Sequence, residues 1–142
     1  MTTIRMLLDT KGREVWTVHP DDSVLDAITM LAEKDIGALI VVENGKPVGI
    51  FSERDYARNV YLKGKSSPDT SVRDTMTSPV LCVGLDRSVK ECMALMTENR
   101  VRHLPVMDGE QLVGLVSIGD LVKSIIAEQK FTIEQLETYI YG

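Results

Sequence analysis

The chain has 142 residues, 44% of them hydrophobic, and its 16 basic and 21 acidic side chains leave a formal net charge of −5. That size and hydrophobic share suit one compact domain with a genuine core, while the acidic balance argues against a general nucleic-acid or membrane-binding surface. No apolar run approaches the roughly 18 residues of a spanning helix. The short, polar N-terminus predicts no secretory signal, so we expect a cytoplasmic protein.

The first half of the chain predicts a β-α-β-β-α unit behind a short N-terminal helical stripe. Strand-forming residues, a serine helix cap and apolar side chains at helical spacing give the first strand and helix. A nearly continuous apolar run follows, as in a strand covered on both faces, and an Asn-Gly pair predicts a hairpin turn. The expected elements are a helix within residues 1–14, a strand at 15–18, a helix from Ser23, strands at 36–42 and 47–51, and a helix from Glu53 to Tyr61.

The second half repeats the first. A shift of 65 positions places residues 15–56 on residues 80–121 without a gap, and 12 of the 42 paired positions are identical, where unrelated segments would match at about two or three. The repeat predicts that the second half adopts the same β-α-β-β-α unit, with Ser88 as the helix cap and a last helix from Ile118 to about residue 128.

Three segments lie outside the two copies. Residues 71–76 predict a short capped helix after a loop, and a Thr-x-x-Gln pattern at Thr132 predicts the start of a separate C-terminal helix with an apolar face. We therefore expect an N-terminal helix and lead-in at 1–14, a first repeat at 15–66, a linker with a short helix at 67–78, a second repeat at 79–128 and an amphipathic helix at 129–142.

One polar pattern, Gly-x-x-Ser-x-x-Asp, occurs in both copies, at residues 49–55 and 114–120. A strand that ends at a helix N-terminus favours an anion, the serine adds a donor, and the aspartate one turn later suits the paired hydroxyls of a ribose. This pattern predicts a phosphoryl or sugar site. The alternative is that Ser-x-x-Asp only caps the helix in each copy.

The basic residues around this pattern differ between the copies. The first copy has Arg54 and Arg58, whereas the second has Arg102 and His103 at the entrance to its apolar strand. If the halves pack about a pseudo-two-fold axis, Arg54 and Arg102-His103 converge on one phosphate. The alternative is a solvated Arg102 and a hydrogen-bonded His103 at a corner of the fold.

Other reactive residue types predict packing and no chemistry. Cys82 and Cys92 lack metal-ligand spacing. We expect them to be small buried apolar residues in a protein of a reducing compartment. His19 has no partner at ligand spacing, and Trp16 suits packing, with stacking on a base as the alternative. We find no nucleophile, acid–base or metal pattern in the sequence and expect no enzyme, no catalytic residues and no metal.

The motifs resemble a tandem pair of cystathionine-β-synthase (CBS) domains. The resemblance covers essentially the whole chain, and its carriers are residues 48–55, 113–120, 101–106 and the lead-in at 72–77. It implies an α+β fold of two βαββα CBS repeats about a pseudo-two-fold axis, a Bateman-type module, whose clefts bind adenosyl ligands such as AMP, ADP, ATP, NAD or S-adenosylmethionine. No further cofactor is implied.

Carried over by position, the resemblance implies two ligand sites. In the first, Asp55 holds the ribose, Ser52 and the basic residues hold the phosphate, and apolar strand residues face the adenine. The first site comprises Ser52, Arg54, Asp55, Leu81, Val101, Arg102 and His103. The second comprises Ser117, Asp120, Trp16, Ile36, Gly37 and Ala38. Since Gly119, Gly37 and Ala38 offer no cation there, we expect the first site to prefer a charged nucleotide and the second to be empty, weaker or suited to a nucleoside.

The predicted function is a stand-alone regulatory sensor. The resemblance implies a homodimer that binds an adenine nucleotide, changes the angle between its subunits and regulates a separate protein in trans, with no nucleic-acid or membrane partner. The alternative is a structural or protein-interaction module without a physiological nucleotide ligand.

Overall fold

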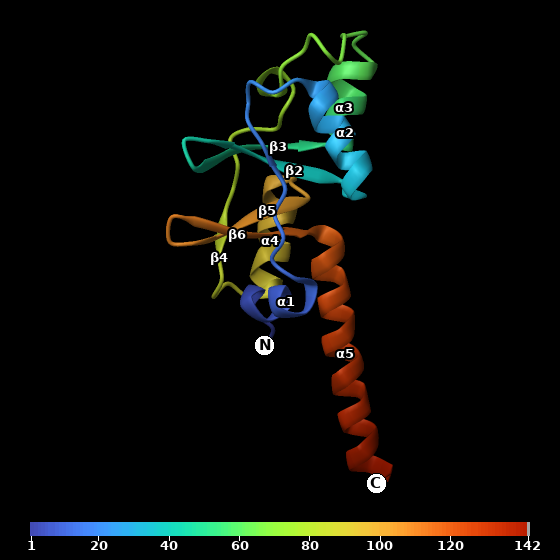
Figure 1. Cartoon of the computed structure of the whole chain (residues 1–142). Helices are drawn as coiled ribbons and strands as arrows, with labels where there is room; N and C mark the ends of the chain where they lie inside the picture. The colour runs from blue at the N-terminus through green and yellow to red at the C-terminus, as the bar shows by residue number, and fades with distance from the viewer. Residues whose placement is uncertain (142) are drawn as a thin grey trace.

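The computed structural model describes residues 1–141 and contains two similar α+β units stacked along one axis, with a long C-terminal helix that projects beyond them (Figure 1). Each unit holds one three-stranded sheet, ordered β1-β2-β3 or β4-β5-β6. The elements are α1 (Ile4–Lys11), β1 (Thr17–Val18), α2 (Val24–Lys34), β2 (Ala38–Glu43), β3 (Lys46–Ser52), α3 (Glu53–Tyr56), η1 (Ala57–Tyr61), η2 (Val72–Asp74), β4 (Val83–Gly84), α4 (Val89–Asn99), β5 (His103–Asp108), β6 (Gln111–Ser117) and α5 (Ile118–Tyr141).

The sheets confirm the repeat in detail. In each, a short strand pairs in parallel with the first strand of an antiparallel hairpin. Both hairpins have an irregular register at the same place, after Val41 in one and after Val106 in the other. Asn44 and Gly45 both have positive φ, as a two-residue hairpin turn of the expected type requires.

Each unit has its own hydrophobic core, and the lead-in segments exchange between them. Ile4 and Leu8 of α1, which precede the first repeat, are buried in the core of the second repeat. Val72 of η2, which precedes the second repeat, is buried in the core of the first. Isolated β-bridges join Thr3 to Ser88 and Ser23 to Ser71. Neither repeat is therefore complete without the segment that leads into the other.

The motif glycines make room for these lead-ins. A Cβ atom built on Gly49 would lie 2.6 Å from Met76 Sδ and 3.0 Å from the Thr77 carbonyl oxygen, and one on Gly114 would lie 2.8 Å from Leu8 Cδ1. Contacts below 3.0 Å would force a neighbour to move, so both positions need glycine for close approach.

A third cluster joins the two units. Ala38, Ile40 and Ile50 of the first sheet are buried against Leu112 and Leu115 of the second. Because the two sheets pack through these side chains, the start of β2 and the start of β5 face each other across a cleft between the repeats.

Two helices differ from expectation. The segment expected as one helix over 53–61 changes to i→i+5 hydrogen bonding after Tyr56 and forms the π-helix η1. The separate C-terminal helix is wrong: α5 runs unbroken from Ile118 to Tyr141. Thr132 does not cap a helix, because its hydroxyl donates to the Glu128 carbonyl oxygen, 3.0 Å away, a bond open to a threonine within a helix. The last predicted residue of that segment, Gly142, lies outside the described residues.

Other boundaries shift by a few residues. The first strand is shorter than expected, at Thr17–Val18, and the apolar run forms its strand from Ala38 to Glu43. Within residues 1–141 we find no helix with the length and hydropathy needed to cross a bilayer.

Candidate functional site

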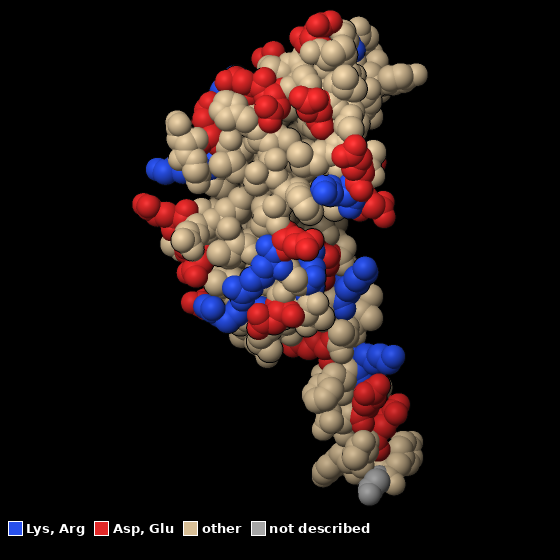
Figure 2. Space-filling model, viewed as in Figure 1, with Lys and Arg blue, Asp and Glu red and all other residues tan. Residues whose placement is uncertain are grey.

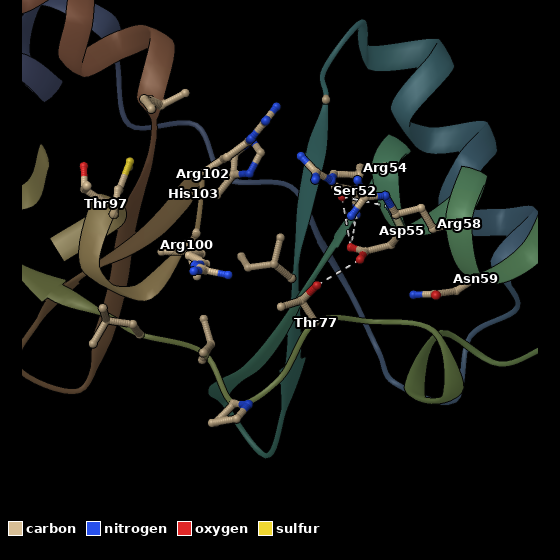
Figure 3. A pocket seen from close by; sticks show the side chains of 18 residues that line it. Ser52, Arg54, Asp55, Arg58, Asn59, Thr77, Thr97, Arg100, Arg102 and His103 are labelled. Carbon is tan, nitrogen blue, oxygen red and sulfur yellow. Dashed lines mark hydrogen bonds between the residues drawn. The ribbon is translucent and has the colours of Figure 1, made fainter. Parts of the chain in front are cut away.

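A cavity of about 690 Å³ lies between the two repeats and is lined by both (Figure 3). Every residue of the first predicted site lines it. Those residues are Ser52, Arg54, Asp55, Leu81, Val101, Arg102 and His103. The structure thus brings together side chains from three separated segments, as the pseudo-two-fold arrangement predicts, while ligand binding by these residues stays a prediction.

Ser52 and Asp55 form a reciprocal cap at the cavity wall. The Asp55 N–H donates to Ser52 Oγ over 3.2 Å, and Asp55 Oδ2 accepts from the Ser52 N–H at 2.9 Å and from the Ser52 hydroxyl at 3.0 Å. The structure therefore confirms that Ser52 and Asp55 cap the helix. The cap does not exclude binding, because the same two residues line the cavity.

Thr77 is a polar neighbour of Asp55 that the sequence did not indicate. Its hydroxyl donates to Asp55 Oδ1 over 2.8 Å, and Asp55 is only 8% exposed. Two backbone hydrogen bonds between Thr77 and Ile50 place the threonine there. Both carboxylate oxygens of Asp55 are thus oriented by protein donors, so the side chain is held in one position at the cavity wall.

Arginines give the cavity a positive wall. Besides the predicted Arg54 and Arg102, Arg58 and Arg100 also line it. The charge of Arg58, and next that of Arg102, lowers the pKa of Arg54 from its ordinary value, which shows that guanidinium groups of both repeats lie close enough to repel one another. Arg100 reaches the cavity because it ends α4 in the left-handed conformation.

His103 is largely enclosed at the start of β5. Burial, followed by the nearby charge of Lys11, lowers its pKa below the ordinary 6.5. The imidazole is therefore mainly neutral at pH 7 and offers the cavity one donor and one acceptor. Arg102 is exposed and His103 is enclosed, and both side chains line the cavity. Both interpretations of this pair, a phosphate contact and a corner of the fold, therefore stay open.

The structure places several residues of the second predicted site in other surroundings. Gly37 lines the first cavity instead, Ala38 is buried between the sheets, and Ile36 packs against the first core. Trp16 lies beneath the Lys34 ammonium, 4.2 Å from the ring centroid. Ligand binding by Ser117 and Asp120 remains a prediction.

A cation from outside the predicted second site lies beside Asp120. Lys11, at the end of α1, donates to Asp120 Oδ2 over 2.6 Å and to the Leu115 carbonyl oxygen over 2.5 Å. Burial alone would raise the pKa of Asp120, but hydrogen bonds from Lys11 and Ser117 outweigh burial and lower it. The sequence did not indicate this contact because 109 residues separate the partners.

Besides Asp21, which lies two residues away in the sequence, the fold brings Glu43 of β2 to His19. Ligand atoms of His19, Asp21 and Glu43 lie within 4.8 Å of one another on the surface. Arg73 already pairs with both carboxylates, at 3.3 Å from Asp21 and 2.7 Å from Glu43, so an arginine neutralises the cluster.

Comparison with known proteins identifies the repeats. The family model of the CBS domain matches residues 10–61 and 72–127. The chain is 37% identical to the mitochondrial CBS domain-containing protein CBSX3 of Arabidopsis thaliana over 151 aligned positions, which cover 99% of this chain and 73% of that protein.

Solved structures agree. A putative signal-transduction protein with CBS domains from Burkholderia ambifaria has 53% identity and a TM-score of 0.84, covering 90% of this chain and 96% of that one. The CBS domain pair of protein MJ0100, solved in complex with 5′-methylthioadenosine and S-adenosyl-L-methionine, shares the fold with a TM-score of 0.78 at 24% identity, covering 90% and 98%. The repeat, the sheets and these matches show that the chain belongs to the CBS-domain family and carries two CBS repeats.

Proposed function

We propose that this CBS pair is a regulatory module that binds an adenosyl nucleotide in the cleft between its repeats. The observation that carries the proposal is the position of Asp55, fixed by Ser52 and Thr77 at the wall of a cavity that also holds arginines. In this proposal Asp55 accepts hydrogen bonds from the ribose hydroxyls, Ser52 and the arginines hold phosphate, and Val101 and Leu81 face the adenine.

The role proposed is regulatory rather than catalytic. Among the described residues that line the cavity, Asp55 is the sole carboxylate, and its oxygens already accept hydrogen bonds from Ser52 and Thr77. Asp55 is therefore not free to exchange a proton with a substrate, as a general acid or base must be. The complex of protein MJ0100 with two adenosyl compounds supports the adenosyl part of the ligand, and we propose that the bound state is read by a separate protein in trans.

We also propose that the chain forms a homodimer through the projecting part of α5. The residues from 129 to 141 are exposed throughout, and tan surface separates the charged groups at this end of the molecule in Figure 2. Positions 122, 126, 129, 133, 136 and 140 follow the alternating four- and three-residue spacing of a coiled coil. One seam position holds Ile126, Ile133 and Ile140, and the other holds Val122, the polar Gln129 and Leu136. A lone helical arm of this length is marginal in water, so its apolar seam favours pairing with a second copy.

The test of ligand binding is a thermal-shift and calorimetric screen with AMP, ADP, ATP, NAD, NADH and S-adenosylmethionine. A ligand at 100 times its Kd stabilises the fold by about 2.7 kcal/mol. Asp55→Asn should weaken the hit strongly. Asp120→Asn changes the matching aspartate of the second repeat and is the control that should bind nearly as the parent does.

Two outcomes would redirect the proposal. A ligand lost in Asp120→Asn but kept in Asp55→Asn would move the site to the second repeat. No response to any adenosyl compound from a folded protein would favour the alternative function, an interaction module without a nucleotide ligand.

A further inference from the structure

The arginines of this protein divide into two groups. The sequence has eight, all within the described residues. Four lie away from the cavity, and each of these pairs with a carboxylate at 2.7–3.3 Å; they are Arg5, Arg13, Arg73 and Arg87. The other four line the cavity, and within residues 1–141 none of them forms an ion pair; they are Arg54, Arg58, Arg100 and Arg102.

The four cavity arginines come from both repeats. Arg54 and Arg58 belong to α3 and η1 of the first repeat, while Arg100 and Arg102 belong to the segment between α4 and β5 of the second. Figure 3 shows the two pairs entering from different walls of the cavity. The mutual repulsion already noted at Arg54 has its source in both groups, Arg58 from its own repeat and Arg102 from the other.

The cavity lining is strongly positive, whereas the protein as a whole is negatively charged. The chain carries a net charge of −5, yet four guanidinium groups share the cavity with a single carboxylate, Asp55. One phosphate monoester brings at most about two negative charges. Each guanidinium can hold two phosphate oxygens in a fork, so four of them exceed what one phosphate group satisfies.

We propose that the cleft selects ligands with at least two linked phosphate groups. This inference rests on the nucleotide-binding function proposed above and narrows its ligand class to nucleoside di- and triphosphates and dinucleotides. The phosphate nearest the ribose lies by Ser52 and Arg54, and the next reaches the arginines of the second repeat. Such a ligand relieves the repulsion between the repeats, whereas S-adenosylmethionine brings a sulfonium cation into the positive wall and is disfavoured.

The test compares adenosine, AMP, ADP, ATP and inorganic pyrophosphate by calorimetry at low and high salt. ADP and ATP should bind at least tenfold more tightly than AMP, and the difference should shrink with salt because it is electrostatic. Arg58→Gln and Arg100→Gln remove one cation from each repeat. Each should lower ATP affinity about tenfold and AMP affinity much less. Arg87→Gln, which removes an arginine paired with Glu91 outside the cavity, is the matched control.

The outcomes separate this inference from the function on which it rests. Equal affinities for AMP, ADP and ATP would overturn the phosphate selection and leave an adenosyl site in place. Binding of pyrophosphate with no affinity for any adenosine compound would overturn the nucleotide function and keep the anion site. An equal loss of ATP affinity in Arg87→Gln would show that overall charge, and not the cavity arginines, sets the preference, and would also overturn the selection.

Discussion

Thr77 and Asp55 are joined by a 2.8 Å hydrogen bond that links the lead-in of the second repeat to the binding cleft of the first. At the corresponding aspartate of the other repeat, Asp120, the partner is a lysine of the opposite lead-in, Lys11. The two halves therefore share a design in which each lead-in holds the motif aspartate of the other repeat. They differ in whether the partner is a neutral hydroxyl or a cation, which sets the charge that a ligand meets.

Thr77→Val should weaken both the fold and the cleft. The substitution keeps the shape and removes the hydroxyl, so Asp55 Oδ1 loses its protein donor. We expect the free energy of unfolding to fall by about 1–2 kcal/mol, measured by urea denaturation, and nucleotide affinity to fall with it. Thr77→Ser keeps the donor and should stay near the parent; an equal loss in both variants would contradict the hydrogen-bond explanation.

Lys11→Met should cost little stability at pH 7. The Lys11–Asp120 pair is partly exposed, so the loss should be no more than about 1 kcal/mol and should shrink in high salt. Because folding lowers the pKa of Asp120 below the ordinary 3.8, the contribution is present above that value and is lost as pH falls through the folded pKa. Parent and variant should converge in acid, and a difference that persists at pH 2 would argue for a packing role of Lys11.

His103 should make stability rise with pH on the acid side of neutrality, up to about 6.5. Its pKa is lowered by folding, so below the ordinary 6.5 the unfolded chain binds the proton that the folded chain resists. Stability should decline as pH drops from about 6.5. The His103→Gln variant should lose this part of the pH dependence, and an NMR titration of the imidazole in the folded protein gives the pKa directly. A titration at or above 6.5 would contradict the prediction.

Gly49→Ala should disturb the cleft through the lead-in. The added methyl group meets Met76 Sδ at 2.6 Å and the Thr77 carbonyl oxygen at 3.0 Å, and overpacking of this kind costs about 1–3 kcal/mol. Movement of Thr77 should also reduce ligand affinity. Gly119→Ala is the control, because its nearest contact is an ordinary 3.6 Å and alanine favours a helix. Thermal unfolding that shows Gly49→Ala to be as stable as the parent would refute the tight contact.

Replacing Ile133 and Leu136 together with glutamate should produce a monomer. Both side chains lie on the apolar seam of α5 and are more than half exposed, so the change should spare the cores and remove the seam. Sedimentation velocity gives the mass of each species, and Glu134→Gln is the matched control on another face of the helix. A parent protein that is already monomeric at high concentration would rule out the α5 dimer.

The sequence predicted most of the fold because the information was local and present twice. Serine caps, the Asn-Gly turn and the apolar runs each act within a few residues, and the 65-residue repeat showed which of them belong together. The family resemblance, with its pseudo-two-fold axis, placed Ser52, Asp55 and Arg102 at one cleft. It did not reach Thr77 or Lys11, because those contacts depend on the exchange of lead-ins between repeats, with partners 22 and 109 residues apart.

The unbroken course of α5 and the position of Arg100 were not predicted, because the local sequence at each is compatible with more than one structure. Thr132 has the sequence of a helix cap, but a threonine hydroxyl also bonds the carbonyl one turn back within a helix. Arg100, at the end of α4, was not among the predicted site residues. Its left-handed backbone, which matches that of Asp35 in the first repeat, turns the chain into the cleft, and only the folded structure places it there.

The exchanged lead-ins bear on how such a chain can arise and be divided. A single repeat with its own lead-in would leave its core open and its lead-in unplaced, and the simplest way to fill both is a reciprocal swap with an identical chain. The present protein has the form of such a swapped pair fused end to end. A cut in the loop at 66–69 should therefore yield two fragments that fold only on meeting, each contributing the segment that the other lacks.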